Sequence, residues 1–332
     1  MERTLTPQPM ALPPDPPSSA HVPGHGPAKG SVPTRPLGRT GEQVSMLGLG
    51  GHHIGIDPNE KDSILLIRRA IDNGITFLDN CWDYNEGQSE IRMGKALAGG
   101  YRQRVFLMTK IDARTRQAAR AQLEQSLQRL QTDCIDLVQI HEVIRMTDPG
   151  RCFAEEGVIR ALVEARTAGK LRFIGFTGHK DPAIHLAMLK MAEQCDFMFD
   201  AVQMPLNVMD AHFRSFEQQV LPVLQAKRIG VLGMKSMGSG DLLKSGVVKP
   251  IECLRYALSL PTSVVICGID NHQVLDQNLA VARNFEPLGS DARKALLART
   301  HEAARDGKFE LFKSSQKYDG TVQNPEWLEQ AS

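Results

Sequence analysis

The sequence lacks any apolar run long enough to cross a membrane, because no window approaches the about 18 consecutive apolar residues that a transmembrane helix needs. It also lacks an excess of charge, since 39 lysines and arginines face 38 aspartates and glutamates in 332 residues. Nucleic acids and acidic membranes are normally bound by a basic patch or stripe. We therefore expect no membrane span and no nucleic-acid partner. The balanced charge leaves the oligomeric state open.

Paired cysteine motifs are missing as well. No two of the six cysteines stand in a Cys-x-x-Cys pattern, which would indicate zinc, an iron–sulfur cluster or a redox pair. Scattered cysteines of this kind usually serve as small core residues, and free thiols fit a reducing compartment. We expect no metal site and a cytoplasmic protein. The six are Cys81, Cys134, Cys152, Cys195, Cys253 and Cys267.

A third absence concerns nucleotide binding by a Rossmann domain. The glycine-rich stretch Leu47-Gly-Leu-Gly-Gly51 does not have the Gly-x-Gly-x-x-Gly spacing, and it runs on to His52 and His53 without the start of a helix. A Rossmann domain is therefore disfavoured.

Composition divides the chain into three parts. Residues 1–35 are crowded with proline, glycine, serine and histidine and lack the charged start and apolar region of a signal peptide, so we predict a disordered arm. Residues 36–289 form the main domain. Residues 290–332 form a C-terminal extension, with a helix from about Ser290 to Arg305. Aromatic residues in its tail, Phe312, Tyr318 and Trp327, indicate that the tail docks onto the main domain.

The main domain alternates short β-rich runs with longer helical patterns, which is typical of βαβ units and a parallel sheet. Helical spacing is clearest from Ala118 to Leu130 and from Val158 to Ala168. Eight strands predict a closed (β/α)8 TIM barrel, in which the carboxyl ends of all strands share one face. The predicted strands are Val44–Gly50, Ile75–Asp79, Val105–Lys110, Ile135–His141, Leu171–Thr177, Phe199–Gln203, Gly230–Lys235 and Ser263–Cys267.

Polar residues stand at the ends of the second, third and fourth of these strands. Asp79, Lys110 and His141 each close an apolar run, and Tyr84 follows Asp79 by five positions. In order and spacing the four resemble the Asp, Tyr, Lys, His tetrad of the aldo-keto reductases. The resemblance runs from about Pro36 to about Phe285.

The four residue types suit the reduction of a carbonyl group by a nicotinamide, which needs a hydride at carbon and a proton at oxygen. We predict that Tyr84 donates the proton and that Lys110 lowers the pKa of its phenol. Asp79 keeps Lys110 charged. His141 orients the carbonyl by donating to its oxygen. The predicted function is NAD(P)H-dependent reduction of an aldehyde or ketone to an alcohol, with a small carbonyl compound as substrate.

The resemblance also implies a nicotinamide dinucleotide across the barrel mouth. Its implied contacts are Gly50, Gly51, Thr177, Gly178, Gln203, Met234, Lys235, Ser236, Gly268, Gln277 and Asn278. Three positions depart from the family pattern. Gly178 lacks an amide that His179 could replace, unless His179 only caps the next helix. Met234 stands where many members have an aromatic residue, and Val274 stands where many have an arginine for the 2′-phosphate. We expect NADP, with NAD possible.

Two other functions fit parts of the sequence. One is a metal-dependent hydrolase, in which histidines and an aspartate near strand ends surround a metal, namely His52, His53, His141, His179 and Asp270. The other is a barrel that binds the dinucleotide as a sensor and docks a partner through its proline-rich arm. Neither function requires Tyr84 to donate a proton, so the set of four favours the reductase.

Overall fold

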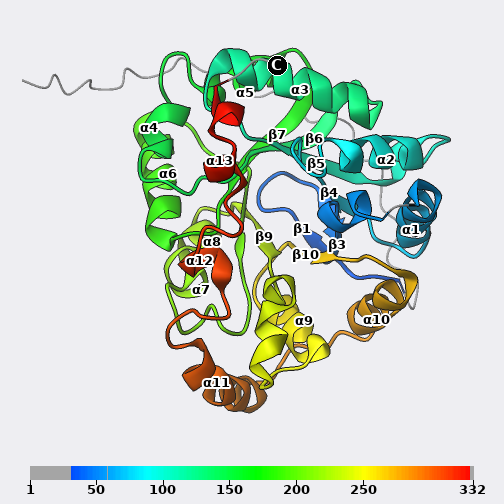
Figure 1. Ribbon diagram of the computed structural model, residues 1–332, viewed down its shortest axis with the longest axis vertical. Coiled ribbons are helices and arrows are strands. Elements are labelled where there is room, and N and C mark those ends of the chain that lie inside the picture. The colour runs from blue at the N-terminus through cyan, green and yellow to red at the C-terminus, as the bar shows by residue number, and fades with distance from the viewer. Residues whose placement is uncertain (1–30, 58, 330–332) are drawn as a thin grey trace, which may run out of the picture.

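A closed barrel of eight parallel strands forms the centre of the molecule (Figure 1), in a computed structural model that describes residues 31–57 and 59–329. The strand order around the barrel is β10-β3-β4-β5-β6-β7-β8-β9. The predicted (β/α)8 barrel is thus confirmed. The strands are β3 (Leu47–Gly50), β4 (Phe77–Asp79), β5 (Phe106–Ile111), β6 (Ile135–Ile140), β7 (Leu171–Thr177), β8 (Ala201–Pro205), β9 (Gly230–Met234) and β10 (Val264–Gly268).

Helices surround the strands on all sides in Figure 1. The helix predicted from Ala118 begins slightly earlier, because the Thr115 hydroxyl caps it by accepting from the backbone of Ala118. Within the described part of the chain, no helix has both the length and the apolar sequence that crossing a membrane requires. The helices are α1 (Glu60–Asp72), α2 (Gln88–Leu97), α3 (Arg116–Leu130), α4 (Asp148–Cys152), α5 (Val158–Thr167), α6 (Pro182–Gln194), α7 (Phe216–Gln219), α8 (Leu221–Ala226), α9 (Pro250–Ser259) and α10 (His272–Arg283), with 3-10 helices η1 (His52–Gly55), η2 (Arg102–Arg104) and η3 (Gly238–Ser245).

A short hairpin precedes the barrel, where we had predicted one continuous strand. Strands β1 (Thr34–Pro36) and β2 (Gln43–Ser45) pair antiparallel, and the chain bends at Met46 before β3 begins. The Met46 backbone donates to Pro33, which holds the bend. Residues 34 and 35, which we had assigned to the arm, therefore belong to a strand. Residues 31–33 of the predicted arm are described as well, with Val32 buried, and only residues 1–30 of the arm lie outside the described residues.

The inside of the barrel is filled with side chains. Phe77 stacks on Phe106 at 5.4 Å between ring centroids, and Phe106 stacks on Phe173 at 6.1 Å. Leu37 of the hairpin is fully buried and belongs to the same interior cluster. Since the interior is packed, polar chemistry is confined to the ends of the barrel.

The C-terminal extension packs on the barrel. The Trp327 ring meets the Trp82 ring edge to face at 5.9 Å, and the Leu328 carbonyl accepts from the backbone of Arg114 at 2.7 Å. The Glu142 carboxylate, just after β6, accepts from two tail amides. The extension contains α11 (Ser290–Ala304), α12 (Leu311–Ser314), α13 (Gly320–Gln323) and η4 (Pro325–Leu328).

Candidate active site

Three of the four predicted catalytic residues converge on one ammonium group. Lys110 Nζ lies 2.5 Å from Oδ1 of Asp79, 2.7 Å from the Asn80 carbonyl and 3.2 Å from the Tyr84 hydroxyl. This convergence follows from the fold, because β4 and β5 are neighbours and Asp79 is the last residue of β4. The geometry can therefore place a phenol, an ammonium and a carboxylate in one chain of hydrogen bonds.

The ion pair inside this group is buried. The side chains of Lys110 and Asp79 are 1% and 5% exposed. Burial alone disfavours the charged amine, but Asp79 outweighs it and raises the pKa of Lys110 above its ordinary value. Lys110 is therefore an ammonium at neutral pH.

Tyr84 is held by contacts on its ring as well as its hydroxyl. Lys110 Nζ lies 4.7 Å from the ring centroid, and the His52 imidazole meets the ring edge to face at 5.2 Å. We predicted that Lys110 would lower the pKa of Tyr84. Burial raises that pKa instead, and the Asp79 carboxylate adds to the increase because its negative charge disfavours a nearby phenolate.

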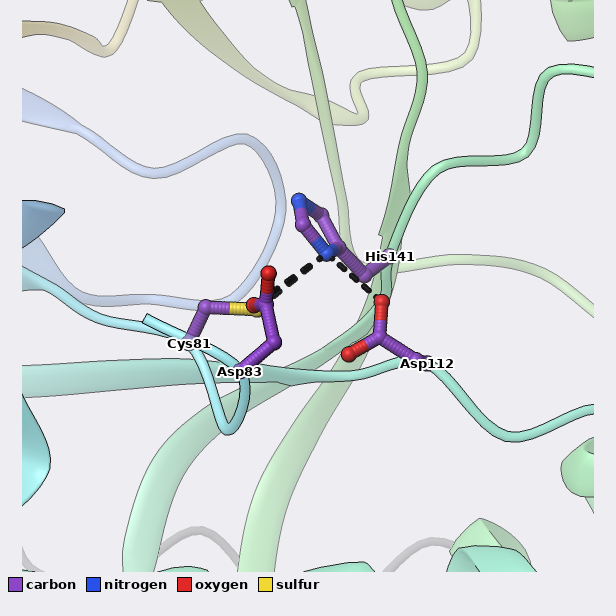
Figure 2. A group of neighbouring side chains, drawn as sticks. All are labelled: Cys81, Asp83, Asp112 and His141. Atoms are coloured by element: carbon purple, nitrogen blue, oxygen red, sulfur yellow. Dashed lines mark hydrogen bonds and ion pairs between the residues drawn. The ribbon is translucent and has the colours of Figure 1, made fainter. Parts of the chain in front are cut away.

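His141 lies beside Tyr84, with 5.9 Å between the ring centroids. Its Nδ1 is 2.8 Å from Oδ1 of Asp112, and this contact fixes the orientation of the ring (Figure 2). Burial disfavours the imidazolium, but Asp112 and Asp83 raise the pKa of His141 overall. The other ring nitrogen points away from these groups in Figure 2 and is the one left to meet a substrate.

Sequence reasoning missed Asp112. It follows Lys110 by two positions, directly after the end of β5, so the criterion that selected Asp79 applied to it too. Its side chain is completely buried. Asp112 therefore belongs with the residues that shape the site.

The implied nicotinamide contacts meet at the ends of β7, β8 and β9. Thr177 pairs with Gln203 across neighbouring strands, and the Thr177 hydroxyl lies 4.0 Å from the Met234 sulfur. The Gln203 Oε1 is buried and accepts no hydrogen bond from any described residue. A buried amide oxygen without a donor is well suited to the amide group of a nicotinamide.

The implied adenine contacts lie on α10. Asn278 is 1% exposed, and its Nδ2 has no acceptor among the described residues, whereas Gln277 is exposed. The helix begins at Asn271, whose side chain caps it by accepting from the Val274 backbone at 2.9 Å. The buried Asn278 Nδ2 and the exposed Gln277 amide lie on the same helix, so both can hydrogen-bond to the edge of the adenine base.

The implied glycine contacts have a structural explanation of their own. A Cβ on Gly50 would lie 2.9 Å from the Cys267 carbonyl, and one on Gly51 would lie 2.5 Å from the Asp79 carbonyl. A Cβ on Gly178 would lie 2.3 Å from the Val143 carbonyl, whereas one on Gly268 would first meet the His53 side chain, at 2.3 Å. Packing against backbone therefore requires Gly50, Gly51 and Gly178 whether or not a dinucleotide binds.

Lys235 is the candidate pyrophosphate contact, and it lies against the C-terminal tail. Its ammonium is 4.7 Å from the Tyr318 ring and 5.4 Å from the Phe312 ring, and it has no ion pair within the described ranges. Burial lowers the pKa of Lys235 to about 8. The adjacent Ser236 hydrogen-bonds with the Cys267 thiol. Lys235 is thus a cation still free to bind an anion.

His179 pairs with the C-terminal tail and does not cap the helix that follows it. Its Nε2 is 2.9 Å from Oδ1 of Asp319 in the tail, and it is 4% exposed. The helix that follows is capped by Asp181 instead. His179 therefore binds the C-terminal tail, because its position just after β7 places it next to Asp319.

The histidines of the alternative hydrolase do not form a metal site. Among the described residues, the ligand atoms that gather as a possible metal group include only His141 from that set. The rings of His52 and His53 meet edge to face at 5.4 Å between centroids, and His179 is paired with Asp319. This arrangement removes the support for the hydrolase.

Comparison with known proteins agrees with this geometry. Residues 46–251 match the sequence model of the aldo/keto reductase family. The chain is 32% identical over 227 residues to the uncharacterized oxidoreductase YrpG of Bacillus subtilis (62% of this chain, 67% of YrpG) and 34% identical over 223 residues to the aldo-keto reductase YhdN of the same organism (61% of each).

Solved structures give the same result. An aldo-keto reductase from Pseudomonas aeruginosa is similar with a TM-score of 0.62 and 26% identity, over 75% of this chain and 94% of the other. The holo form of aldo-keto reductase AKR11C1 from Bacillus halodurans shares the fold with a TM-score of 0.67 and 23% identity, over 80% and 95% of the two chains. Since the family model covers more than half of the sequence, this chain belongs to the aldo-keto reductase family of oxidoreductases.

Proposed function

We propose that this protein reduces an aldehyde or ketone to an alcohol with NADPH, and that NADH can replace NADPH. The observation that carries the proposal is the hydrogen-bonded chain from Asp79 through Lys110 to the Tyr84 hydroxyl at the carboxyl ends of adjacent strands. In a TIM barrel this is the end where catalytic residues gather. The family to which the chain belongs reduces carbonyl groups with nicotinamide cofactors.

The chain's own residues handle the proton. The nicotinamide supplies a hydride when bound, and Tyr84 gives the hydroxyl proton to the carbonyl oxygen. A developing alkoxide is a stronger base than a phenolate, so this transfer is favourable even though burial raises the pKa of the phenol. Lys110 then lies 3.2 Å from the resulting phenolate and stabilises it. His141 donates from its free ring nitrogen and orients the carbonyl.

The dinucleotide fits polar groups that the protein leaves without partners. The Gln203 Oε1 can accept from the nicotinamide amide, and the Asn278 Nδ2 can donate to the adenine. Lys235 and Ser236 supply a cation and a hydroxyl for the pyrophosphate. We favour NADP because the family does, although Val274 offers no charge to a 2′-phosphate. The six unpaired cysteines support a reducing compartment, and we place the protein in the cytoplasm.

Replacement of Tyr84 by phenylalanine tests the proposal. It removes the hydroxyl but keeps the ring, which the contacts with Lys110 and His52 hold in place. We expect kcat to fall by about 10²- to 10⁴-fold, the usual contribution of a positioned acid, while the Kd for NADPH changes little. The measurements are a screen of small aldehydes and ketones and a fluorescence titration with NADPH and NADH.

Each unfavourable outcome has a distinct meaning. An unchanged kcat in Tyr84→Phe contradicts the proposed acid. Tight dinucleotide binding without turnover of any carbonyl compound favours the sensory function. Failure of the wild-type protein to bind either dinucleotide contradicts the reductase proposal altogether.

A further inference from the structure

A cluster of four side chains that can bind a metal lies on the Nδ1 side of His141 and includes that residue (Figure 2). It joins the Cys81 thiol and the Asp83 carboxylate from the loop after β4, Asp112 from the end of β5, and His141 from the end of β6. One ligand atom of each lies within 4.8 Å of those of the other three. Only His141 belongs to the proposed proton-transfer set, so the cluster needs an explanation of its own.

The hydrogen bonds within this cluster do not satisfy its members. Nδ1 of His141 lies 2.8 Å from Oδ1 of Asp112, 3.2 Å from the Cys81 sulfur and 3.6 Å from Oδ1 of Asp83. A single Nδ1 proton can serve only one of these three acceptors well.

Two carboxylate oxygens in the cluster are left over. Oδ2 of Asp112 is buried and accepts no hydrogen bond from the described residues, on a side chain that is fully buried. Oδ1 of Asp83 is also buried without a hydrogen-bond partner among the described residues, although the Asp83 side chain hydrogen-bonds with the Cys81 thiol. Native proteins rarely leave buried carboxylate oxygens unsatisfied, because the lost solvation is costly. In Figure 2 the free oxygen of Asp112 points toward the side of Cys81 and Asp83.

The donor set and its spacing select one class of ligand. A thiolate, an imidazole and two carboxylates are ligands of Zn²⁺, which takes four in a tetrahedron at about 2.0 to 2.3 Å, so that neighbouring ligand atoms are about 3.3 to 3.6 Å apart. Of the three distances from Nδ1, the one to Asp83 lies at the upper end of that range, whereas those to Cys81 and Asp112 are shorter, as hydrogen bonds without an ion would be. Mg²⁺ and Ca²⁺ prefer six or more oxygen ligands, which this cluster does not offer.

We propose that Cys81, Asp83, Asp112 and the Nδ1 atom of His141 form a binding site for Zn²⁺. The side chains of Asp83 and His141 are 14% and 12% exposed, so an ion can enter from the barrel mouth. Zinc on Nδ1 requires the proton of a neutral His141 to be on Nε2, the nitrogen that points away from the cluster. Without zinc, only an imidazolium can donate from Nδ1 to Asp112 and from Nε2 to a carbonyl at the same time. The site shares His141 with the proposed proton-transfer set, but the inference rests on this geometry and does not require the proposed reductase activity.

Cobalt titration of the untagged full-length protein, after treatment with a chelator, tests the site. Co²⁺ replaces Zn²⁺ in tetrahedral sites, and a thiolate ligand gives it a near-ultraviolet charge-transfer band. We expect one equivalent to bind with that band and with the visible bands of tetrahedral cobalt, and we expect Zn²⁺ to displace it. Cys81→Ser should abolish the charge-transfer band, and Asp112→Asn should weaken Zn²⁺ binding at least about tenfold, measured by calorimetry.

A matched cysteine variant and a second ligand variant keep the result interpretable. Cys134→Ser removes another unpaired thiol, at the opposite end of β6, and should leave the band and the affinity unchanged. Asp83→Asn changes a partly exposed turn residue and should also weaken binding, even if Cys81→Ser proves unstable. The proposal is overturned if wild-type protein binds no stoichiometric Co²⁺ or Zn²⁺, or if Cys81→Ser retains the band. Neither result bears on the Tyr84→Phe test.

Discussion

The Asp79–Lys110 ion pair is buried, and burial determines how much the loss of one partner changes the free energy of unfolding. The substitution Asp79→Asn keeps the shape of the side chain and removes its charge. Lys110 then keeps only neutral acceptors, the Asn80 carbonyl at 2.7 Å and the Tyr84 hydroxyl at 3.2 Å, in a site where its side chain is 1% exposed. Removing one partner of a buried pair leaves the other charge uncompensated and costs about 3 to 5 kcal/mol. We expect a loss of that size in the free energy of unfolding.

The same substitution on the surface provides the control. Arg69 and Asp276 are paired at 2.7 Å, but their side chains are 41% and 56% exposed. Water replaces a lost partner there, so Asp276→Asn should cost less than about 1 kcal/mol. Urea-induced unfolding, followed by the fluorescence of Trp82 and Trp327, measures both variants. Equal losses in the two variants would refute the argument from burial.

A double variant separates the pair from its parts. If Asp79→Asn is costly because it strands a buried ammonium, then adding Lys110→Met should recover part of the loss, since no buried charge remains. We expect the double variant to be less destabilised than the sum of the two single variants. Additive losses would show that the two side chains stabilise the fold through separate contacts. Carbonyl reduction should be lost in all variants at Lys110.

Two further predictions concern pH. Lys235 has a pKa of about 8 and binds an anion only when it is charged, so the Kd for NADPH should rise between pH 7 and pH 9. Lys235→Met should bind NADPH weakly, with a Kd that does not change over this pH range. A rise in Kd that persists in the variant would show that Lys235 is not the titrating group. Glu310 is buried beside Lys313, and burial raises the pKa of Glu310 to about 7. The folded state therefore retains a proton on Glu310 that the unfolded state loses near pH 4.5. Stability from this group is lost as pH rises toward 7. The melting temperature of Glu310→Gln should therefore fall less between pH 5 and pH 8 than that of the wild type, and parallel curves would contradict this.

The barrel could be predicted, and the candidate catalytic residues could be selected, because both depend on local patterns. Apolar runs ended by Asp79, Lys110 and His141 are visible in the sequence, and the topology of a parallel barrel brings such ends together. The bend at Met46 could not be predicted in this way. The run from Val44 to Gly50 has no interruption, and the bend depends on a hydrogen bond to Pro33 that only the folded hairpin provides.

The pKa values and ion-pair partners in the site were harder to predict than the residues that form it. The sequence places a lysine near Tyr84, but it does not show that Asp79 neutralises that lysine and that burial then dominates the pKa of the phenol. His179 illustrates the same difficulty. Its position after β7 suggested a cofactor contact, and the structure pairs it with Asp319, which is 140 positions later in the chain. Distant partners of this kind are set by tertiary structure alone.

The C-terminal tail contributes to the barrel mouth as much as the strands do. Glu142, His179 and Lys235 follow three different strands, and each contacts a tail residue. Among the described residues, the four proton-transfer residues form no hydrogen bond, ion pair or ring contact with the tail. They are held by strand ends and by one another. The chemistry is thus positioned by the rigid barrel, whereas the surroundings of Lys235 are set by Tyr318 and Phe312. It follows that residues of the tail can vary the choice of ligand without disturbing the groups that transfer the proton.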